Sequence, residues 1–204
     1  MPRLADHDQR RKQITDAARR VVARDGLGSA TFQSVAAEAG ISVRLVQYYF
    51  GTKRAFLLAT HQAVVADAGA RFARGLDALG SDPTPREVIR TVLAELLPTD
   101  AARRQDTVLL NTFHTAALTA PAEEPGIVAD DTLSAPRFLV RTIAEQLRRI
   151  RPGGPASPED TADLDAELIV AATAGLAQTL LVDPNAAERA DALLDRLLDR
   201  MAAG

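Results

Sequence analysis

Apolar residues recur at helical spacing along almost the whole of this 204-residue chain, and glycine or proline interrupts them repeatedly. In residues 8–25, for example, Ile14, Ala17, Ala18 and Val21 fall on one stripe of a helix. No stretch alternates apolar and polar residues in the way that a half-buried strand would. The pattern therefore predicts an all-α protein of about nine helices.

Capping residues and loops mark the breaks between the predicted helices. The run Thr-Pro-Arg-Glu that begins at Thr84 is a capping box with proline in the first turn of a helix. Proline-rich and glycine-rich loops are expected at 121–126 and 152–158. Near the end, Asn185 together with Glu188 is expected to cap the last helix.

Composition excludes several classes of chemistry. The chain has no cysteine, and His7, His61 and His114 are far apart without metal-ligand spacing, so neither a metal nor a cofactor is expected. No phosphate-binding loop or nucleophile elbow is present, which argues against an enzyme. We found no apolar run of the ~18 residues that a membrane helix needs and no signal peptide, so a cytoplasmic protein without a membrane partner is expected.

Charge is distributed unevenly along the chain. Residues 1–56 carry ten Arg or Lys against five Asp or Glu, whereas residues 57–204 carry fourteen against twenty-two. A basic front on an acidic body indicates that the front binds a polyanion. Ordinary surface charge is the alternative interpretation.

The segment 31–50 has the features of a helix-turn-helix. Thr31 is a good N-cap for the first short helix, Gly40 permits the positive φ that a tight turn needs, and Ser42 can cap the second helix. Since Val46 and Phe50 are expected in the core, elimination leaves an outward-facing set on the second helix. This set consists of Val43, Arg44, Leu45, Gln47 and Tyr48. A helical hairpin used only for packing is the alternative.

The outward set is suited to the major groove of DNA. Arg44 can hydrogen-bond to guanine and Gln47 can pair with adenine, while Val43, Leu45 or Tyr48 can contact thymine methyl groups.

Residues 14–58 resemble the DNA-binding domain of the TetR family of bacterial regulators, above all through the run Tyr48-Tyr-Phe-Gly-Thr-Lys-Arg-Ala-Phe-Leu57. Residues 174–184 resemble, more weakly, the BetI-type regulatory domain of that family. The resemblance implies an N-terminal three-helix DNA-binding domain (1–52), followed by a helical-bundle domain for ligand binding and dimerisation (53–204).

The resemblance also implies a homodimer that binds double-stranded DNA at a palindromic operator, as a repressor released by a small-molecule effector. The implied DNA-binding residues are Thr31, Ser42, Val43, Arg44, Leu45, Gln47, Tyr48, Tyr49 and Lys53. Among them, Thr31 and Lys53 would contact phosphates and Tyr49 would lie near the DNA backbone. Positions 43–45 often carry Lys, Gly or Thr in the family, whereas here they are Val-Arg-Leu. The operator sequence therefore cannot be inferred from that of a relative.

Two apolar stripes near the C-terminus predict a dimer interface. Two helices of one chain can pair with two from a second chain as a four-helix bundle. The interface candidates are Leu168, Ala172, Gly175, Leu176, Leu180, Leu193, Leu194, Leu197 and Met201. The alternative is that these stripes pack inside one subunit.

A ligand pocket is expected among the middle helices, lined by interior side chains. The candidates are Phe72, Leu76, Leu93, Leu97, Phe113, His114, Leu118, Phe138 and Ile169. Each of them can instead be an ordinary core residue, and His114 can be a structural histidine. Few charged side chains fall on the inner faces, which favours an apolar or uncharged effector.

The sequence therefore predicts a ligand-responsive transcriptional repressor. An all-α enzyme is one rival interpretation, and a small-molecule-binding or interaction protein that has lost DNA binding is the other. Val43 and Leu45 at groove positions keep the second rival open.

Overall fold

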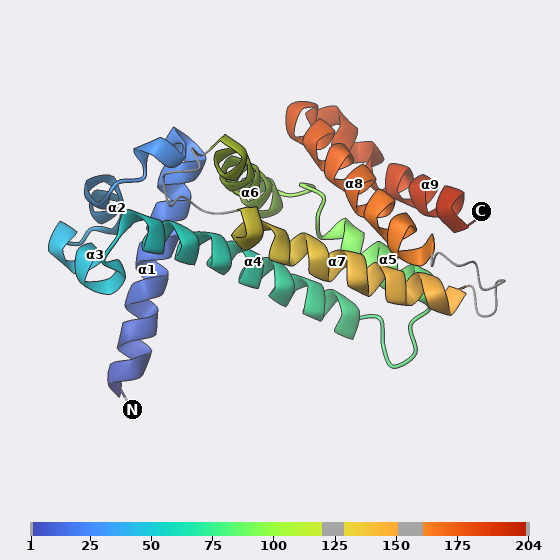
Figure 1. Ribbon diagram of the computed structural model, residues 1–204, viewed down its shortest axis with the longest axis horizontal. Helices are drawn as coiled ribbons and strands as arrows, with labels where there is room; N and C mark the ends of the chain where they lie inside the picture. The colour runs from blue at the N-terminus through green and yellow to red at the C-terminus, as the bar shows by residue number, and fades with distance from the viewer. Residues whose placement is uncertain (1, 120–128, 151–160, 203–204) are drawn as a thin grey trace. The chain divides into compact units, whose positions relative to one another are not determined.

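A computed structural model describes residues 2–119, 129–150 and 161–202, and the fold over these ranges is all-α, as predicted (Figure 1). Its nine α-helices and two short 3-10 helices are α1 (Pro2–Asp25), η1 (Leu27–Ser29), α2 (Phe32–Ala39), α3 (Val43–Phe50), α4 (Lys53–Asp77), α5 (Pro85–Ala94), α6 (Ala101–Thr119), α7 (Ala129–Ile150), α8 (Thr161–Val182), η2 (Pro184–Arg189) and α9 (Ala190–Ala202). The loops expected at 121–126 and 152–158 lie outside the described residues.

Most predicted helix ends are confirmed by their caps. Thr31, Ser42 and Thr84 each accept a hydrogen bond from the backbone N–H three residues on, and Thr84 with Glu87 completes the capping box. The first helix begins at Pro2 rather than near residue 8.

The predicted capping of the last helix is wrong. Asp183, and not Asn185 with Glu188, is the capping residue in this region. Its carboxylate accepts a hydrogen bond from the Asn185 N–H at 3.0 Å and starts η2, which precedes α9. Pro184 in the first turn of η2 lacks an N–H, so the residue before it is the natural cap.

The chain packs as two compact units, and α4, α6 and α7 each contribute to both. Unit 1 comprises residues 1–66 and 108–132, and unit 2 comprises residues 67–107 and 133–204. This division by packing differs from the predicted boundary between a DNA-binding domain (1–52) and a ligand-binding domain (53–204). That boundary stays a prediction about function.

The core of unit 1 is built around the three N-terminal helices. Ile14 and Val21 of α1, Val46 of α3 and Phe56 of α4 are fully buried. Phe113 of α6 joins the same core. These contacts hold the two short helices α2 and α3 against α1, because helices of eight residues are not stable alone.

The core of unit 2 joins α5, α7, α8 and α9, and α5, α8 and α9 lie side by side (Figure 1). Its fully buried residues include Leu93, Ile143, Ile169 and Leu194. On the surface, Arg90 of α5 bridges two acidic residues of α9 in a row of ion pairs between these helices.

Candidate nucleic-acid interface

The turn between α2 and α3 has the geometry of a helix-turn-helix. Gly40 has a φ of 67° and its N–H bonds back to the carbonyls of Ala36 and Ala37. The N–H of Ile41 also bonds to the Ala36 carbonyl, at 3.0 Å, which closes the end of α2. Ser42 then starts α3 by accepting from the Leu45 N–H at 3.2 Å. A side chain with a Cβ would be strained at position 40, which explains the glycine.

The predicted outward face of α3 is exposed at three positions and half-buried at two. Arg44, Gln47 and Tyr48 are exposed, and Tyr48 is 78% exposed. Val43 and Leu45 are half-buried, and Val43 packs against the core of unit 1. The assignment of Val43 as purely outward is therefore wrong, because the first turn of α3 lies close to the core. An amide, a guanidinium and a phenol on one exposed helix face can offer hydrogen bonds to base edges.

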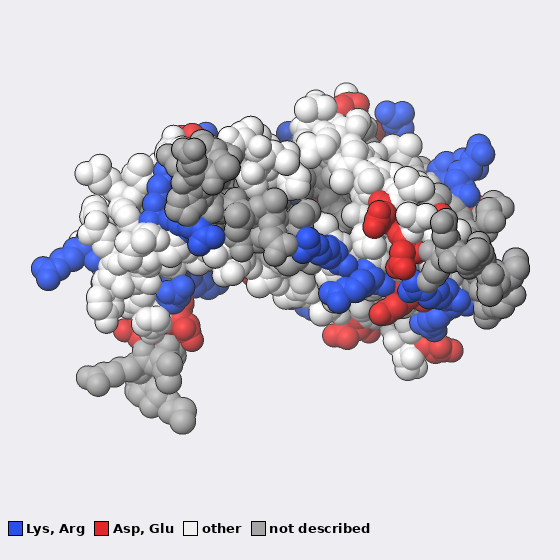
Figure 2. All heavy atoms as spheres, viewed as in Figure 1, with Lys and Arg blue, Asp and Glu red and all other residues white. Residues whose placement is uncertain are grey.

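On the face of unit 1 seen in Figure 2, uncharged residues cover most of the surface around α2 and α3, and both basic and acidic residues lie around it.

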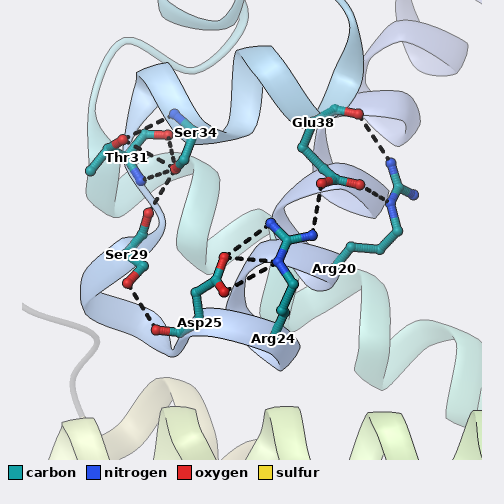
Figure 3. Close-up of polar contacts among 7 residues, drawn as sticks. All are labelled: Arg20, Arg24, Asp25, Ser29, Thr31, Ser34 and Glu38. Carbon is teal, nitrogen blue, oxygen red and sulfur yellow. Dashed lines mark hydrogen bonds and ion pairs between the residues drawn. The ribbon is translucent and has the colours of Figure 1, made fainter.

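Thr31 lies at the exposed N-terminus of α2, where its side chain is part of a cap (Figure 3). Its hydroxyl oxygen accepts from the Ser34 N–H at 3.1 Å, and the Ser34 hydroxyl accepts from the Thr31 N–H at 2.9 Å. The Ser34 hydroxyl also donates to the Ser29 carbonyl at 2.7 Å, so the cap is tied to η1. A contact between Thr31 and a phosphate stays a prediction.

Lys53 is exposed at the first position of α4, and its ammonium group donates to the Gly28 carbonyl at 3.2 Å. The helix behind it is capped by Thr52, whose hydroxyl accepts from the Ala55 N–H. A cation at a helix N-terminus beside free N–H groups can hold an anion such as a phosphate. Tyr49 is half-buried, with its ring 5.4 Å from that of Tyr48.

The sequence reading missed an ion-pair network between α1 and α2 (Figure 3). Glu38 of α2 accepts from Arg20 at 2.6 Å and from Arg24 at 3.1 Å, and Arg24 also pairs with Asp25. Hydrogen bonds from Arg20 and then Arg24 hold the pKa of Glu38 below its usual value of 4.5. The four-residue spacing of the two arginines places both on one helix face, which is the signal that could have found them.

The predicted pocket residues do not form one set. Leu93, Leu97 and Ile169 are buried in the core of unit 2, and Phe72 and Leu76 pack against that core. Phe113 instead belongs to the core of unit 1.

The prediction that the remaining pocket candidates are interior side chains is wrong for this single chain. His114 is exposed, Leu118 is 72% exposed and Phe138 is half exposed. The reason is the orientation of α6, which buries Phe113 and turns the next residue outward. Phe138 makes an edge contact with Phe72 at 6.4 Å.

The buried histidine is His61, which the sequence reading did not select. It is 4% exposed, and its ring lies 5.3 Å from that of Phe113 in an edge-on contact. The helical spacing of the apolar residues Phe56, Leu57 and Val64 along the same helix would have shown that His61 falls on the buried face. Over the described part of the chain, no group of three or more His, Asp or Glu is placed to hold a metal.

The predicted interface residues on α8 and α9 divide between the surface and the core. Leu180 and Leu194 are buried inside unit 2, so their assignment to a surface between chains is wrong. Leu168 is 62% exposed, and Ala172 and Gly175 are exposed beside it. Leu193 is also exposed, and Leu176 and Leu197 are half-buried. The side chain of Met201 lies outside the described residues.

Helix α8 carries large apolar residues on its exposed side as well as its buried one, since Leu164, Leu168 and Val182 are all exposed. By length and composition α8 could also cross a membrane, which the sequence analysis did not anticipate. In this chain, 28% of its apolar window is buried. Core helices pass the same test of length and composition, because burial in a protein also requires apolar residues. We refer to Leu164, Leu168, Ala172, Gly175 and Val182 as the open face of α8.

Comparison with known proteins gives matches in the N-terminal part of the chain and over the whole fold. The family model described as "Bacterial regulatory proteins, tetR family" matches residues 14–60. The HTH-type transcriptional regulator PksA of Bacillus subtilis is 35% identical over 103 residues, which are 49% of this chain and 47% of PksA. The regulator BetI of Burkholderia thailandensis is 42% identical over 94 residues, 46% of this chain and 47% of that protein. The matched region thus spans about half the length of these curated relatives.

A solved structure is similar over nearly the whole chain. The crystal structure of a transcriptional regulator from Saccharomonospora viridis in complex with choline has a TM-score of 0.77 and 24% identity, and the match covers 94% of this chain and 96% of that one. This likeness shows the fold. The part of the chain that holds the helix-turn-helix, residues 14–60, thus matches the TetR family of bacterial regulatory proteins.

Proposed function

We propose that this chain acts as a homodimer that binds a palindromic DNA operator and represses transcription until a small molecule releases it. The observation that carries the proposal is the exposed set of Arg44, Gln47 and Tyr48 on one face of α3. The Gly40 turn presents this face away from the core, and the Lys53 ammonium group lies at the start of the next helix. We propose that Thr31, Ser42, Tyr49 and Lys53 contact the DNA backbone and that the α3 face reads bases.

The open face of α8 supports the dimer. An apolar face on a helix is costly to leave in water, and a second copy of the chain would cover it with the same face. Small residues at Ala172 and Gly175 would allow two such helices to approach closely. A dimer presents two copies of α3, and about 34–36 Å between them would match successive major grooves.

The apolar interior of unit 2 supports an apolar or uncharged effector. Phe72 and Leu76 lie near the end of α4 and pack against this interior. Because α4 is continuous from Lys53 to Asp77, a ligand that displaced Phe72 would displace the helix that begins at Lys53. The chain has no Trp, and both its tyrosines are in α3, so an aromatic cage for a quaternary ammonium such as choline is not expected. Such a regulator would act in the cytoplasm and would need no metal or cofactor.

The test of the proposed function is selection of bound sequences from a random DNA pool. The selected site is expected to be a palindrome, and binding to it should weaken steeply between two salt concentrations. A chain that enriches no sequence and does not retard genomic DNA fragments would instead be an interaction or small-molecule-binding protein without DNA binding.

The effector is tested by linkage once the operator is known. A panel of apolar and uncharged compounds would be screened for a rise in the melting temperature of the full chain. A true effector must weaken operator binding by the same factor by which the operator weakens effector binding. A compound that binds equally well with and without operator would not be the effector.

A further inference from the structure

One face of α1 holds the C-terminal end of α3. The guanidinium of Arg11 donates from Nη1 to the Tyr49 carbonyl at 2.9 Å, and its central carbon lies 4.4 Å from the centre of the Phe50 ring. His7, one turn earlier on α1, has its ring 4.9 Å from that of Tyr49. Two residues of α1 therefore contact the last turn of α3.

The Arg11 contact completes the end of the helix. The last carbonyls of a helix lack partners within it. In α3, the Gln47 carbonyl accepts from the Gly51 N–H at 2.7 Å and the Phe50 carbonyl accepts from the Thr52 N–H at 2.6 Å. Between them, the Tyr49 carbonyl accepts from Arg11. A cation at this end also interacts favourably with the helix dipole.

The same part of α1 holds the end of α2. The Gln13 side-chain amide donates to the Ala39 carbonyl at 2.8 Å, next to the Gly40 turn. The Gln13 side-chain oxygen accepts from Arg10 at 2.6 Å, which orients the amide. Both helices of the helix-turn-helix are thus fastened at their C-terminal ends by side chains of α1.

We propose that Arg11 is a positioning residue for base reading, an inference that rests on the proposed DNA-binding function. Gln47 and Tyr48 occupy the turn that Arg11 holds, so release of the Tyr49 carbonyl and the Phe50 ring would let both exposed side chains shift. The loss would fall on discrimination between sequences. Charge attraction to phosphates would be retained, because Arg11 is bound to α3 rather than directed at solvent.

The test compares Arg11→Met with Lys12→Met and Arg11→Lys. Arg11→Met retains an apolar stem beside Phe50 and removes the donor. Lys12→Met removes one positive charge from the adjacent position, where the ammonium pairs with Asp16 on α1 itself. Each variant is measured for binding to the selected operator and to a scrambled duplex over a range of salt concentrations. Near-ultraviolet circular dichroism supplies a second measurement, since the only two tyrosines of the chain, Tyr48 and Tyr49, lie in α3.

Arg11→Met is expected to lower the ratio of operator to scrambled affinity about tenfold, the effect of a misplaced base contact, with an unchanged salt slope. Its tyrosine signal should change while the far-ultraviolet helix signal is kept. Arg11→Lys should recover part of the ratio, and Lys12→Met should retain the wild-type ratio and tyrosine signal.

Two results would overturn the proposal. One is an Arg11→Met chain with the wild-type ratio and tyrosine signal. The other is equal weakening on both duplexes with a salt slope lower by about one, which would make Arg11 a phosphate contact. If Arg11→Met does not fold, the same ratio and signal measured on Arg11→Lys decide, and wild-type values there overturn the proposal. A wild-type chain that selects no sequence would overturn the proposed function itself, which is a separate outcome.

Discussion

Arg71 of α4 and Asp106 of α6 form an ion pair of 2.9 Å inside unit 2. Glu95, which follows α5, extends the pair into a network, because it lies 3.4 Å from Arg71 and 2.5 Å from Arg103. Three segments of unit 2 are thus joined by alternating charges that are largely withdrawn from water.

We predict that burial decides how much such an ion pair contributes to the free energy of unfolding. Asp106→Asn should lower the free energy of unfolding by about 3 kcal/mol, because it leaves Arg71 poorly compensated where the Asp106 side chain is only 11% exposed. Asp195→Asn removes one of the two acidic partners of Arg90, at a similar distance of 2.8 Å. Because the Asp195 side chain is 45% exposed, this change should cost less than about 1 kcal/mol. Urea unfolding of the two variants checks this, and equal losses would contradict it.

Base reading by α3 predicts a loss specific to the operator. Arg44→Ala or Gln47→Ala should weaken operator binding by about 1–3 kcal/mol while sparing most binding to unrelated DNA. Both side chains are exposed, so protein stability should be unchanged. Electrophoretic retardation on operator and scrambled duplexes measures the difference. Wild-type operator affinity in both variants would mean that α3 does not read the DNA.

Phosphate contact by Lys53 predicts a different pattern. Lys53→Ala should weaken operator and scrambled DNA alike and lower the salt slope by about one unit. The lost hydrogen bond to the Gly28 carbonyl is exposed and should affect stability little. A loss confined to the operator would instead place Lys53 among the base-reading residues.

The open face of α8 predicts how the proposed dimer can be broken without unfolding the chain. Leu168→Asp adds a charge at an exposed position and should give a folded monomer by sedimentation, since burial of an unpaired carboxylate costs several kcal/mol. Operator affinity should fall with it. Ala73→Asp on the exposed surface of α4 is the matched control and should stay dimeric. Leu194→Asp should unfold the chain, because Leu194 is fully buried. A dimeric Leu168→Asp chain would place the interface elsewhere.

The lowered pKa of Glu38 predicts a pH-dependent contribution to stability. A carboxyl whose folded pKa lies below its unfolded value stabilises the fold above the usual pKa of 4.5, and this contribution is lost as the pH falls through the folded pKa. Glu38→Gln should therefore be less stable than wild type at pH 7, and the difference should shrink towards about pH 2.5. Urea midpoints at the two pH values measure it. A difference independent of pH would mean that the arginines do not stabilise the charged form.

Local structure was predictable from the sequence wherever a residue type strongly favours one backbone conformation or one capping position. Gly40 could be assigned to the turn because a positive φ is free of strain only for glycine, and Thr84 with Glu87 could be assigned to a cap because both partners lie within four residues. Burial of Val46 and Phe50 together followed from their four-residue spacing, which places both on one side of α3.

Periodicity could not decide which of two adjacent apolar residues in a helix is buried. Along α8, Ile169 is buried while its neighbour Leu168 is exposed, and in α9 Leu194 is buried while Leu193 is exposed. In each of these pairs, two apolar residues differ only in which one meets the other helices of unit 2. In α6, packing within unit 1 likewise buries Phe113 and leaves His114 exposed. Likewise, the contacts of Glu38 with Arg20 and of Arg11 with Tyr49 join residues 18 and 38 positions apart. The sequence by itself determined the helices, most of their caps and the helix-turn-helix, because those depend on neighbours in the chain. Only the tertiary structure decided which faces are buried and which distant charges meet, because those depend on how the helices pack.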